Sequence, residues 1–282
     1  MKLRKLFAVL LAALLVLSSA AALAEITIGV PNDTTNEARA LQLLADNGII
    51  ELAEGAGETA TKADVIADGV EIVEVQADQL VNQLPDLDYA VINSNFVLDA
   101  LDAGFEINKA LLTEVEEKYL PRANVIAVNG DNVDADLTKA LVAAATRQQG
   151  KDYIEATYAG AVLSVVENPT DGYDPDVEYD ALAGSTLVIA ATPAPHAQIL
   201  EIVKEILAET DISLDIAVFT GYTEENPAVD AGDAYANYFQ HQPYLDDYVA
   251  ETGGNVVSVA IVHTEPMGLY GGRQADLSAL GK

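Results

Sequence analysis

Short apolar runs alternate with segments of helical periodicity along the chain from residue 26 onward. Residues 197–207 are typical of the helical segments, because apolar side chains recur there every three or four positions. Such alternation predicts an α/β fold with largely parallel, buried sheets. The runs that predict strands are 26–30, 71–75, 89–92, 124–128, 186–190, 214–219 and 255–262.

Two stretches share one design, which runs from a strand through a proline-bearing turn into a helix. Residues 26–48 read ITIGVPNDTTNEARALQLLADNG, and residues 186–207 read TLVIAATPAPHAQILEIVKEIL. In the first stretch, Thr34 and Glu37 are spaced as a capping box, and Gly48 suits the end of the helix. The repeat predicts two similar lobes, each directing a helix N-terminus at a cleft. Free N–H groups and partial positive charge there favour a bound carboxylate.

The first residues have the pattern of a secretion signal. Basic Lys2, Arg4 and Lys5 precede an apolar run, and Ala22-Leu23-Ala24 forms a cleavage pattern. We therefore predict a signal peptide over 1–24 and an exported chain that is soluble from Glu25 onward. An uncleaved membrane anchor is the alternative, because 6–24 is uncharged and just reaches spanning length. The chain contains no cysteine, which excludes disulfides, thiolate metal sites and lipid anchoring through a cysteine.

The chain is strongly acidic. Its formal net charge is −31, and signal cleavage would lower this to −34 by removing Lys2, Arg4 and Lys5. Such a field repels nucleic acid and anionic lipid, so we expect no nucleic-acid partner.

Residues 167–182, ENPTDGYDPDVEYDAL, predict an acidic solvated linker. Its alternating acids could bind calcium, but the loop lacks the glycine and distal glutamate of an EF-hand.

Aromatic side chains are concentrated in residues 219–249, although the whole chain has only 5 Phe and 12 Tyr and no Trp. Mixed with His, Gln and Asn, they suit a pocket with apolar walls and a few selective polar groups. A tyrosine-rich edge of the core is the equal alternative. The side chains concerned are Tyr222, Tyr235, Tyr238, Phe239, His241, Tyr244 and Tyr248.

Arg39 is the second distinctive residue, since arginines are scarce and this one lies just inside a predicted helix. A guanidinium can grip a carboxylate with two parallel hydrogen bonds, although an ion pair with one of the many acids is the alternative.

For His196 a structural role is favoured over an approach to the cleft. His263 ends a predicted strand and is interpreted as a hinge or surface residue.

Several motifs resemble the methionine-binding lipoprotein family, the substrate-capturing components of methionine ABC importers. They are IGVPNDTTNEARALQLLADNGIIEL, DYAVINSN, NVIAV, TPAPHAQILEIVKEIL, ANYFQHQPYLDDY and HTEPMGLY. In that family the TPAPHAQ half comes first, whereas here the VPND half leads. The chain therefore resembles a circular permutant in which 167–182 bridges the former termini. The resemblance implies a type II periplasmic-binding-protein-like fold, with one lobe from 25–121 plus 267–282 and another from 122–266.

The resemblance also implies the site. Tyr222, Phe239, His241 and Tyr244 would line one side of the pocket, and Arg39, Asn93 and Asn124 would face them, with Asn95 as an alternative to Asn93. Arg39 would hold the substrate carboxylate, the Asn carbonyls would accept from its ammonium group, and the aromatic rings would surround a thioether chain.

The function expected is capture of L-methionine or a similar amino acid for an ABC importer permease. We expect a monomer, with no enzymatic activity, no cofactor and no metal. One alternative is an exported nucleotide-dependent α/β enzyme, since Gly55, Gly57 and Ala60 fit G-x-G-x-x-A without a convincing preceding strand. Another is a surface interaction protein with an acidic, tyrosine-rich face.

Overall fold

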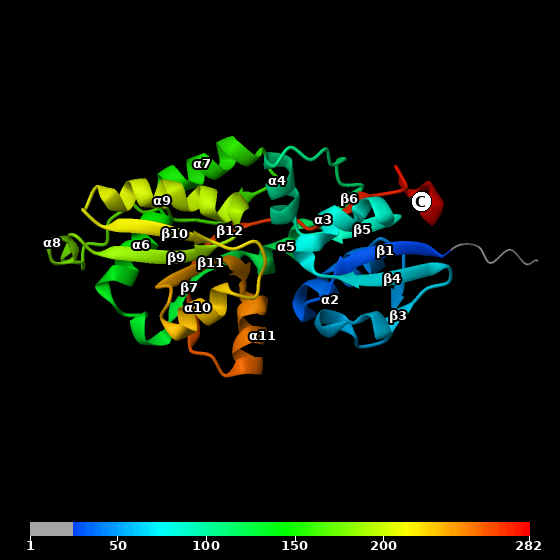
Figure 1. The fold of residues 1–282 in the computed structure, drawn as a ribbon, viewed down its shortest axis with the longest axis horizontal. Helices are drawn as coiled ribbons and strands as arrows, with labels where there is room; N and C mark the ends of the chain where they lie inside the picture. Colours follow the sequence, from blue (N-terminus) through cyan, green and yellow to red (C-terminus); the bar gives the residue numbers. More distant parts are fainter. Residues whose placement is uncertain (1–24) are drawn as a thin grey trace, which may run out of the picture.

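Two α/β lobes lie side by side in the computed structural model, which describes residues 25–282 (Figure 1). The predicted two-lobed α/β architecture is confirmed. Every predicted strand is present to within two residues at either end. The predicted signal peptide over 1–24 falls outside the described residues. Within 25–282, no helix has the length and apolar character needed to cross a membrane.

The first lobe is built on a five-stranded sheet in the order β4-β1-β5-β13-β6. Strands β4, β1 and β5 run parallel, and β13 runs antiparallel to both of its neighbours. The strands are β1 (Ile26–Pro31), β4 (Val70–Val75), β5 (Tyr89–Ile92), β6 (Leu112–Thr113) and β13 (Gly268–Gly271). A separate pair, β2 (Glu51–Leu52) and β3 (Val65–Ile66), is antiparallel.

The second lobe repeats this arrangement in the order β10-β9-β11-β7-β12-β8. Here β10, β9 and β11 are parallel, and β7 is the antiparallel strand inserted before β12. The strands are β7 (Asn124–Asn129), β8 (Leu163–Ser164), β9 (Thr186–Ala191), β10 (Ser213–Val218), β11 (Ala236–His241) and β12 (Val256–Thr264). In both lobes the antiparallel strand enters directly from the other lobe.

Helices cover the faces of the two sheets (Figure 1). In the second lobe, α6, α7 and α9 pack on the sheet around a core that includes Leu141, Ile154, Leu200 and Tyr238. In the first lobe, α2 packs Leu41 and Leu44 against the sheet. The helices are α2 (Thr34–Asp46), α3 (Leu80–Gln83), α4 (Ser94–Asp102), α5 (Glu116–Tyr119), α6 (Asp136–Ala145), α7 (Gln148–Tyr158), α8 (Tyr179–Leu182), α9 (Gln198–Ala208), α10 (Glu225–Ala231) and α11 (Gln242–Thr252).

Two crossovers join the lobes, over residues 114–123 and 265–267. They run next to each other, because the Glu114 N–H donates to the Met267 carbonyl at 3.0 Å and the Thr264 hydroxyl donates to the Tyr119 carbonyl at 2.9 Å. Paired crossovers of this kind form a hinge about which two rigid lobes can close.

The start of α2 differs from the predicted capping box. Asp33 is the N-cap, and its Oδ1 accepts from the backbone N–H of Asn36 at 3.0 Å. Glu37 instead accepts from the backbone N–H of Lys62 at 2.7 Å, so the prediction for Thr34 and Glu37 was wrong. Gly48 takes a φ of +63° directly after the C-cap, as predicted for the helix end.

The acidic segment 167–182 is docked on the second lobe and is not a free linker. The side chain of Val177 is 8% exposed and joins the hydrophobic core of that lobe. The Thr170 hydroxyl donates to the Ala143 carbonyl at 2.5 Å, and the Asp174 N–H donates to the Tyr179 hydroxyl at 2.9 Å. Composition predicted solvation here because the acids outnumber the few apolar residues that anchor the segment.

The C-terminus lies at the same end of the first lobe as the start of β1 (Figure 1). Leu277 and Leu280 pack against the hydrophobic cluster that contains Ile28, and the Tyr89 hydroxyl donates to the Asp276 carbonyl at 2.7 Å. A circular permutation requires this closeness of sequence ends. The permuted order itself stays a prediction.

Candidate ligand-binding site

A cavity lies between the lobes, beside the crossovers, with about 370 Å³ of space between the atoms when the open solvent at its mouth is included. It brings together all the residues predicted for the site: Arg39, Asn93, Asn124, Tyr222, Phe239, His241 and Tyr244. Its wall also contains residues that were not predicted as primary contacts: Asn36, Ser94, Asn95, His196, Gln240 and Glu265.

Three aromatic rings form a triangle on the second-lobe side of the cavity. The ring centroid of Tyr222 lies 5.9 Å from that of Phe239 and 5.8 Å from that of Tyr244, and the last two are 5.8 Å apart. The Tyr244 hydroxyl donates to the Tyr222 carbonyl at 3.0 Å, which fixes the loop before α10 against α11. Phe96 of the first lobe packs on Tyr222 at 4.9 Å, so the triangle is closed from across the cleft.

His241 connects the aromatic wall to the first lobe. Its Nδ1 accepts from the backbone N–H of Tyr244 at 3.1 Å and caps α11. Burial, with Arg39 and Arg122 nearby, holds the pKa of His241 well below its usual value, so the ring is neutral. Because Nδ1 accepts, the proton lies on Nε2, which donates to Asn36 Oδ1 of the first lobe at 3.3 Å.

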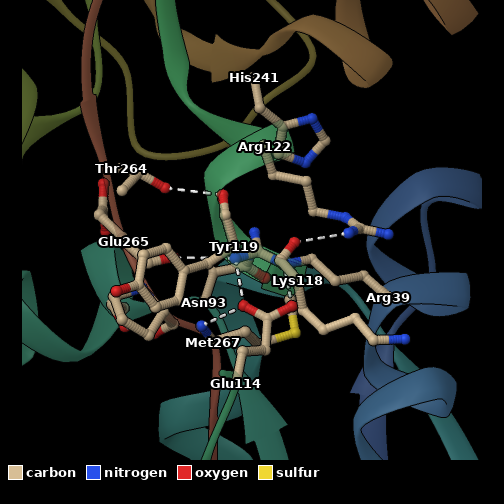
Figure 2. Close-up of polar contacts among 12 residues, drawn as sticks. Arg39, Asn93, Glu114, Lys118, Tyr119, Arg122, His241, Thr264, Glu265 and Met267 are labelled. Atoms are coloured by element: carbon tan, nitrogen blue, oxygen red, sulfur yellow. Dashed lines mark hydrogen bonds and ion pairs between the residues drawn. The ribbon is translucent and has the colours of Figure 1, made fainter. Parts of the chain in front are cut away.

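Arg39 lies on the inward face of α2 and is 5% exposed. Its Nε donates to Glu114 Oε1 at 2.8 Å and its Nη2 donates to Glu114 Oε2 at 2.5 Å (Figure 2). Nη2 also donates to the Glu265 carbonyl at 2.8 Å. The predicted two-pronged grip on a substrate carboxylate is therefore wrong, since Glu114 occupies that edge of the guanidinium. Among the described residues, Nη1 has no hydrogen-bond partner.

Two asparagines place amide groups in the cavity from opposite lobes. Asn93 follows β5, is 6% exposed, and donates from Nδ2 to Asn36 Oδ1 at 2.9 Å. Its Oδ1 has no hydrogen-bond partner within residues 25–282. Asn124 begins β7, and its Oδ1 lies 3.1 Å from His196 Nε2. A buried acceptor without a donor, such as Asn93 Oδ1, is costly unless a ligand or water supplies one.

Sequence reasoning missed Glu265, and of its two alternatives for His263, a hinge or a surface residue, the structure excludes the second. His263 is fully buried, so the surface interpretation was wrong. Its Nδ1 is hydrogen-bonded to the Tyr238 hydroxyl, and its Nε2 is 2.9 Å from Glu265 Oε1. The signal that could have found Glu265 is its position two residues after His263, directly beyond the end of β12.

His196, His263 and Glu265 are the group in residues 25–282 that could hold a metal ion, with ligand atoms within 4.8 Å of one another. Each imidazole nitrogen already has a protein partner. His196 Nδ1 lies 2.7 Å from the Thr192 hydroxyl, and its Nε2 is the partner of Asn124. We therefore interpret the group as a hydrogen-bonded support for the hinge.

A family model described as NlpA lipoprotein matches residues 18–166 and 187–282. The chain belongs to the NlpA lipoprotein family. Segment 167–182, docked on the second lobe, falls in the unmatched interval, so it is an addition to the part shared with the NlpA lipoprotein family.

Individual relatives align over shorter stretches. Membrane lipoprotein TpN32 of Treponema pallidum is 42% identical over 85 residues, which is 30% of this chain and 32% of that protein. Methionine-binding lipoprotein MetQ of Bacillus subtilis is 40% identical over 30% of this chain and 31% of its own length. D-methionine-binding lipoprotein MetQ of Escherichia coli K12 is 38% identical over 42% of this chain and 43% of its own length. The chain thus spans about a third to a half of the length of these relatives.

Among solved structures, a lipoprotein of Ruminococcus gnavus is 44% identical, covers 51% of this chain and 61% of that chain, and has a TM-score of 0.45. A nutrient-binding protein of Burkholderia cenocepacia, bound to methionine, is 42% identical. The match covers 28% of this chain and 34% of that chain, with a TM-score of 0.27.

Behind the aromatic wall, this NlpA-family chain buries a network of amides. Gln240 donates to Asn226 Oδ1 at 2.6 Å and to Asn237 Oδ1 at 3.0 Å, and accepts from Asn226 Nδ2 at 2.8 Å. Next to it, Glu225 is 0% exposed, and neither carboxylate oxygen has a hydrogen-bond partner in the described chain. Burial raises the pKa of Glu225 to about 8.

We expect the contribution of Glu225 to the stability of the protein to fall as pH rises from about 4.5 to about 8. In that range the folded state keeps a proton on Glu225 that the unfolded chain, with an ordinary pKa of 4.5, releases. Glu225→Gln should therefore be more stable than the wild type at pH 9, by on the order of 5 kcal/mol, and by much less at pH 5. Urea unfolding at both pH values measures this difference. Glu224→Gln, at the exposed neighbouring position, should unfold like the wild type; equal behaviour of the two variants would contradict the assignment.

Proposed function

We propose that the protein is an extracytoplasmic solute-binding protein that captures a small zwitterionic amino acid, with methionine as the first candidate, for an ABC importer. The observation that carries this proposal is Asn93, which lines a cavity between two hinged lobes and whose buried Oδ1 has no donor within residues 25–282. The names of the relatives support it, since two are described as binding methionine or D-methionine.

The cavity offers complementary groups for each part of an amino acid. Arg39 Nη1 is the donor for the carboxylate, although Glu114 already offsets part of the charge of Arg39. Asn93 Oδ1 and the Glu265 carboxylate, which also lines the cavity, are acceptors for the ammonium group. Opposite charges in a dry site favour a zwitterion over a ligand with net charge.

The aromatic triangle accounts for the side-chain preference. A thioether chain between Tyr222, Phe239 and Tyr244 gains about 1.5 to 3 kcal/mol from burial and about 0.3 to 1.5 kcal/mol from sulfur–ring contacts. The polar end provides affinity for any amino acid, whereas the rings select among side chains.

Capture proceeds by closure of the lobes about the two crossovers, followed by delivery to a membrane permease, with no covalent chemistry. The predicted export signal is consistent with a role in the cell envelope. The nucleotide-enzyme alternative has weaker support, because Gly57 begins a short 3-10 turn and the preceding β2 forms an antiparallel pair with β3, its one neighbour among the described strands. A dinucleotide site requires a parallel strand that leads into a helix N-terminus.

Calorimetric titration of residues 25–282 with L-methionine should show saturable binding at one site. Asn93→Ala should weaken it about 10- to 100-fold, because it removes a hydrogen bond to a charged ligand group. Asn108→Ala, at an exposed position on the same lobe, is the matched control and should bind like the wild type. Failure of the wild type to bind any amino acid contradicts the proposed function.

Phe239→Ala should change selectivity more than general affinity. Removing this ring takes away contact with a thioether chain but leaves the polar end intact, so methionine should bind about 10-fold or more weakly, while alanine should bind nearly unchanged. Competition titrations with both amino acids measure the ratio. An equal loss for methionine and alanine would show that Phe239 supports the fold of the site and not its selectivity.

A further inference from the structure

A second set of contacts joins the lobes outside the cavity, between the end of α4 and the start of α9. Gln198 Nε2 of the second lobe donates to Asp102 Oδ2 of the first lobe at 2.5 Å. The Tyr158 hydroxyl donates to Gln198 Oε1 at 2.6 Å. In Figure 1, α4 lies at the junction of the two lobes, beside α7 and α9. Neither Gln198 nor Asp102 lines the cavity.

Gln198 is oriented from within its own lobe. Tyr158 is 8% exposed and belongs to the hydrophobic core of the second lobe, so its hydroxyl is held in a fixed place. Because that hydroxyl donates a hydrogen bond to the amide oxygen of Gln198, the amide nitrogen is directed toward α4. A donor that is already oriented loses less conformational entropy when it meets an acceptor.

Asp102 occupies a position that its own helix disfavours. It is the last residue of α4, where the carbonyl end of the helix dipole repels a carboxylate. Asp99, one turn earlier, adds like charge, and burial together with Asp102 raises the pKa of Asp99. Asp102 is exposed to solvent, and lobe closure adds to its hydration a hydrogen bond from the other lobe, which offsets part of this repulsion.

We propose that Gln198 and Asp102 form a latch that holds the lobes closed and slows ligand release without contact to the ligand. Leu98 adds to it, since this α4 side chain packs against the hydrophobic core of the second lobe. Both latch residues are positioning residues. The effect on release rests on the proposed function, whereas the effect on lobe closure does not.

Stopped-flow measurement of methionine release tests the latch. Gln198→Ala and Asp102→Ala should each speed dissociation about threefold to tenfold, leave the association rate nearly unchanged, and be non-additive when combined. The matched control is Gln148→Ala, because Gln148 Nε2 donates to Asp152 Oδ1 at 2.7 Å within α7, in one lobe. This control should release ligand like the wild type. Unchanged release in Gln198→Ala would overturn the latch and leave the proposed function intact.

Small-angle X-ray scattering of the ligand-free protein gives a second measurement that needs no ligand. Gln198→Ala should shift the population toward the open form and increase the radius of gyration, whereas Gln148→Ala should match the wild type. If the wild type binds no amino acid, the proposed function fails and scattering alone decides the latch. A radius of gyration in Gln198→Ala equal to that of the wild type would then refute it.

Discussion

The buried ion pair between Arg39 and Glu114 is the interaction on which the arrangement of the site depends. Two charges removed from water are stabilised only when their geometry is close and their remaining atoms are bonded. The geometry here is close, and further bonds support the pair. Arg39 also donates to the Glu265 carbonyl, and Glu114 Oε2 also accepts from the backbone N–H of Met267 at 2.7 Å, so only Arg39 Nη1 is without a partner among the described residues. The pair thereby joins α2 to both crossovers. The same residues therefore form one edge of the cavity and part of the hinge.

This coupling gives the two sides of the cavity different characters. On the side of α2, fixed charges and amides face the cavity and move with the hinge. On the opposite side, the pairing of β11 with β7 is irregular between Tyr238 and Gln240, which leaves Phe239 as an extra residue. A β-bulge redirects side chains. Tyr238 enters the core of the second lobe, while Phe239 joins the aromatic triangle.

Local patterns gave most of the fold but not all of its strands. Runs of apolar residues were sufficient for β1, β5 and β9, because these strands are largely buried on both faces and need no alternation. Strand β11 was missed, since ANYFQH mixes aromatic and polar residues that serve the site and the core at once. Strand β13 was missed because GLYG has glycines at both ends, which are rare in strands.

The sequence by itself determined the α/β class, the two repeated lobes and the residue types that gather at the cleft. Each of these depends on periodicity or on a short motif, which a few neighbouring residues encode. Only the tertiary structure decided how those residues are paired. Arg39 meets Glu114 rather than an open edge of the cavity, Asn93 keeps an oxygen with no partner in the part of the chain that the structure describes, and Glu265 lines the cavity. These pairings join segments far apart in the chain, and their energies depend on burial and distance that exist only once the lobes have closed.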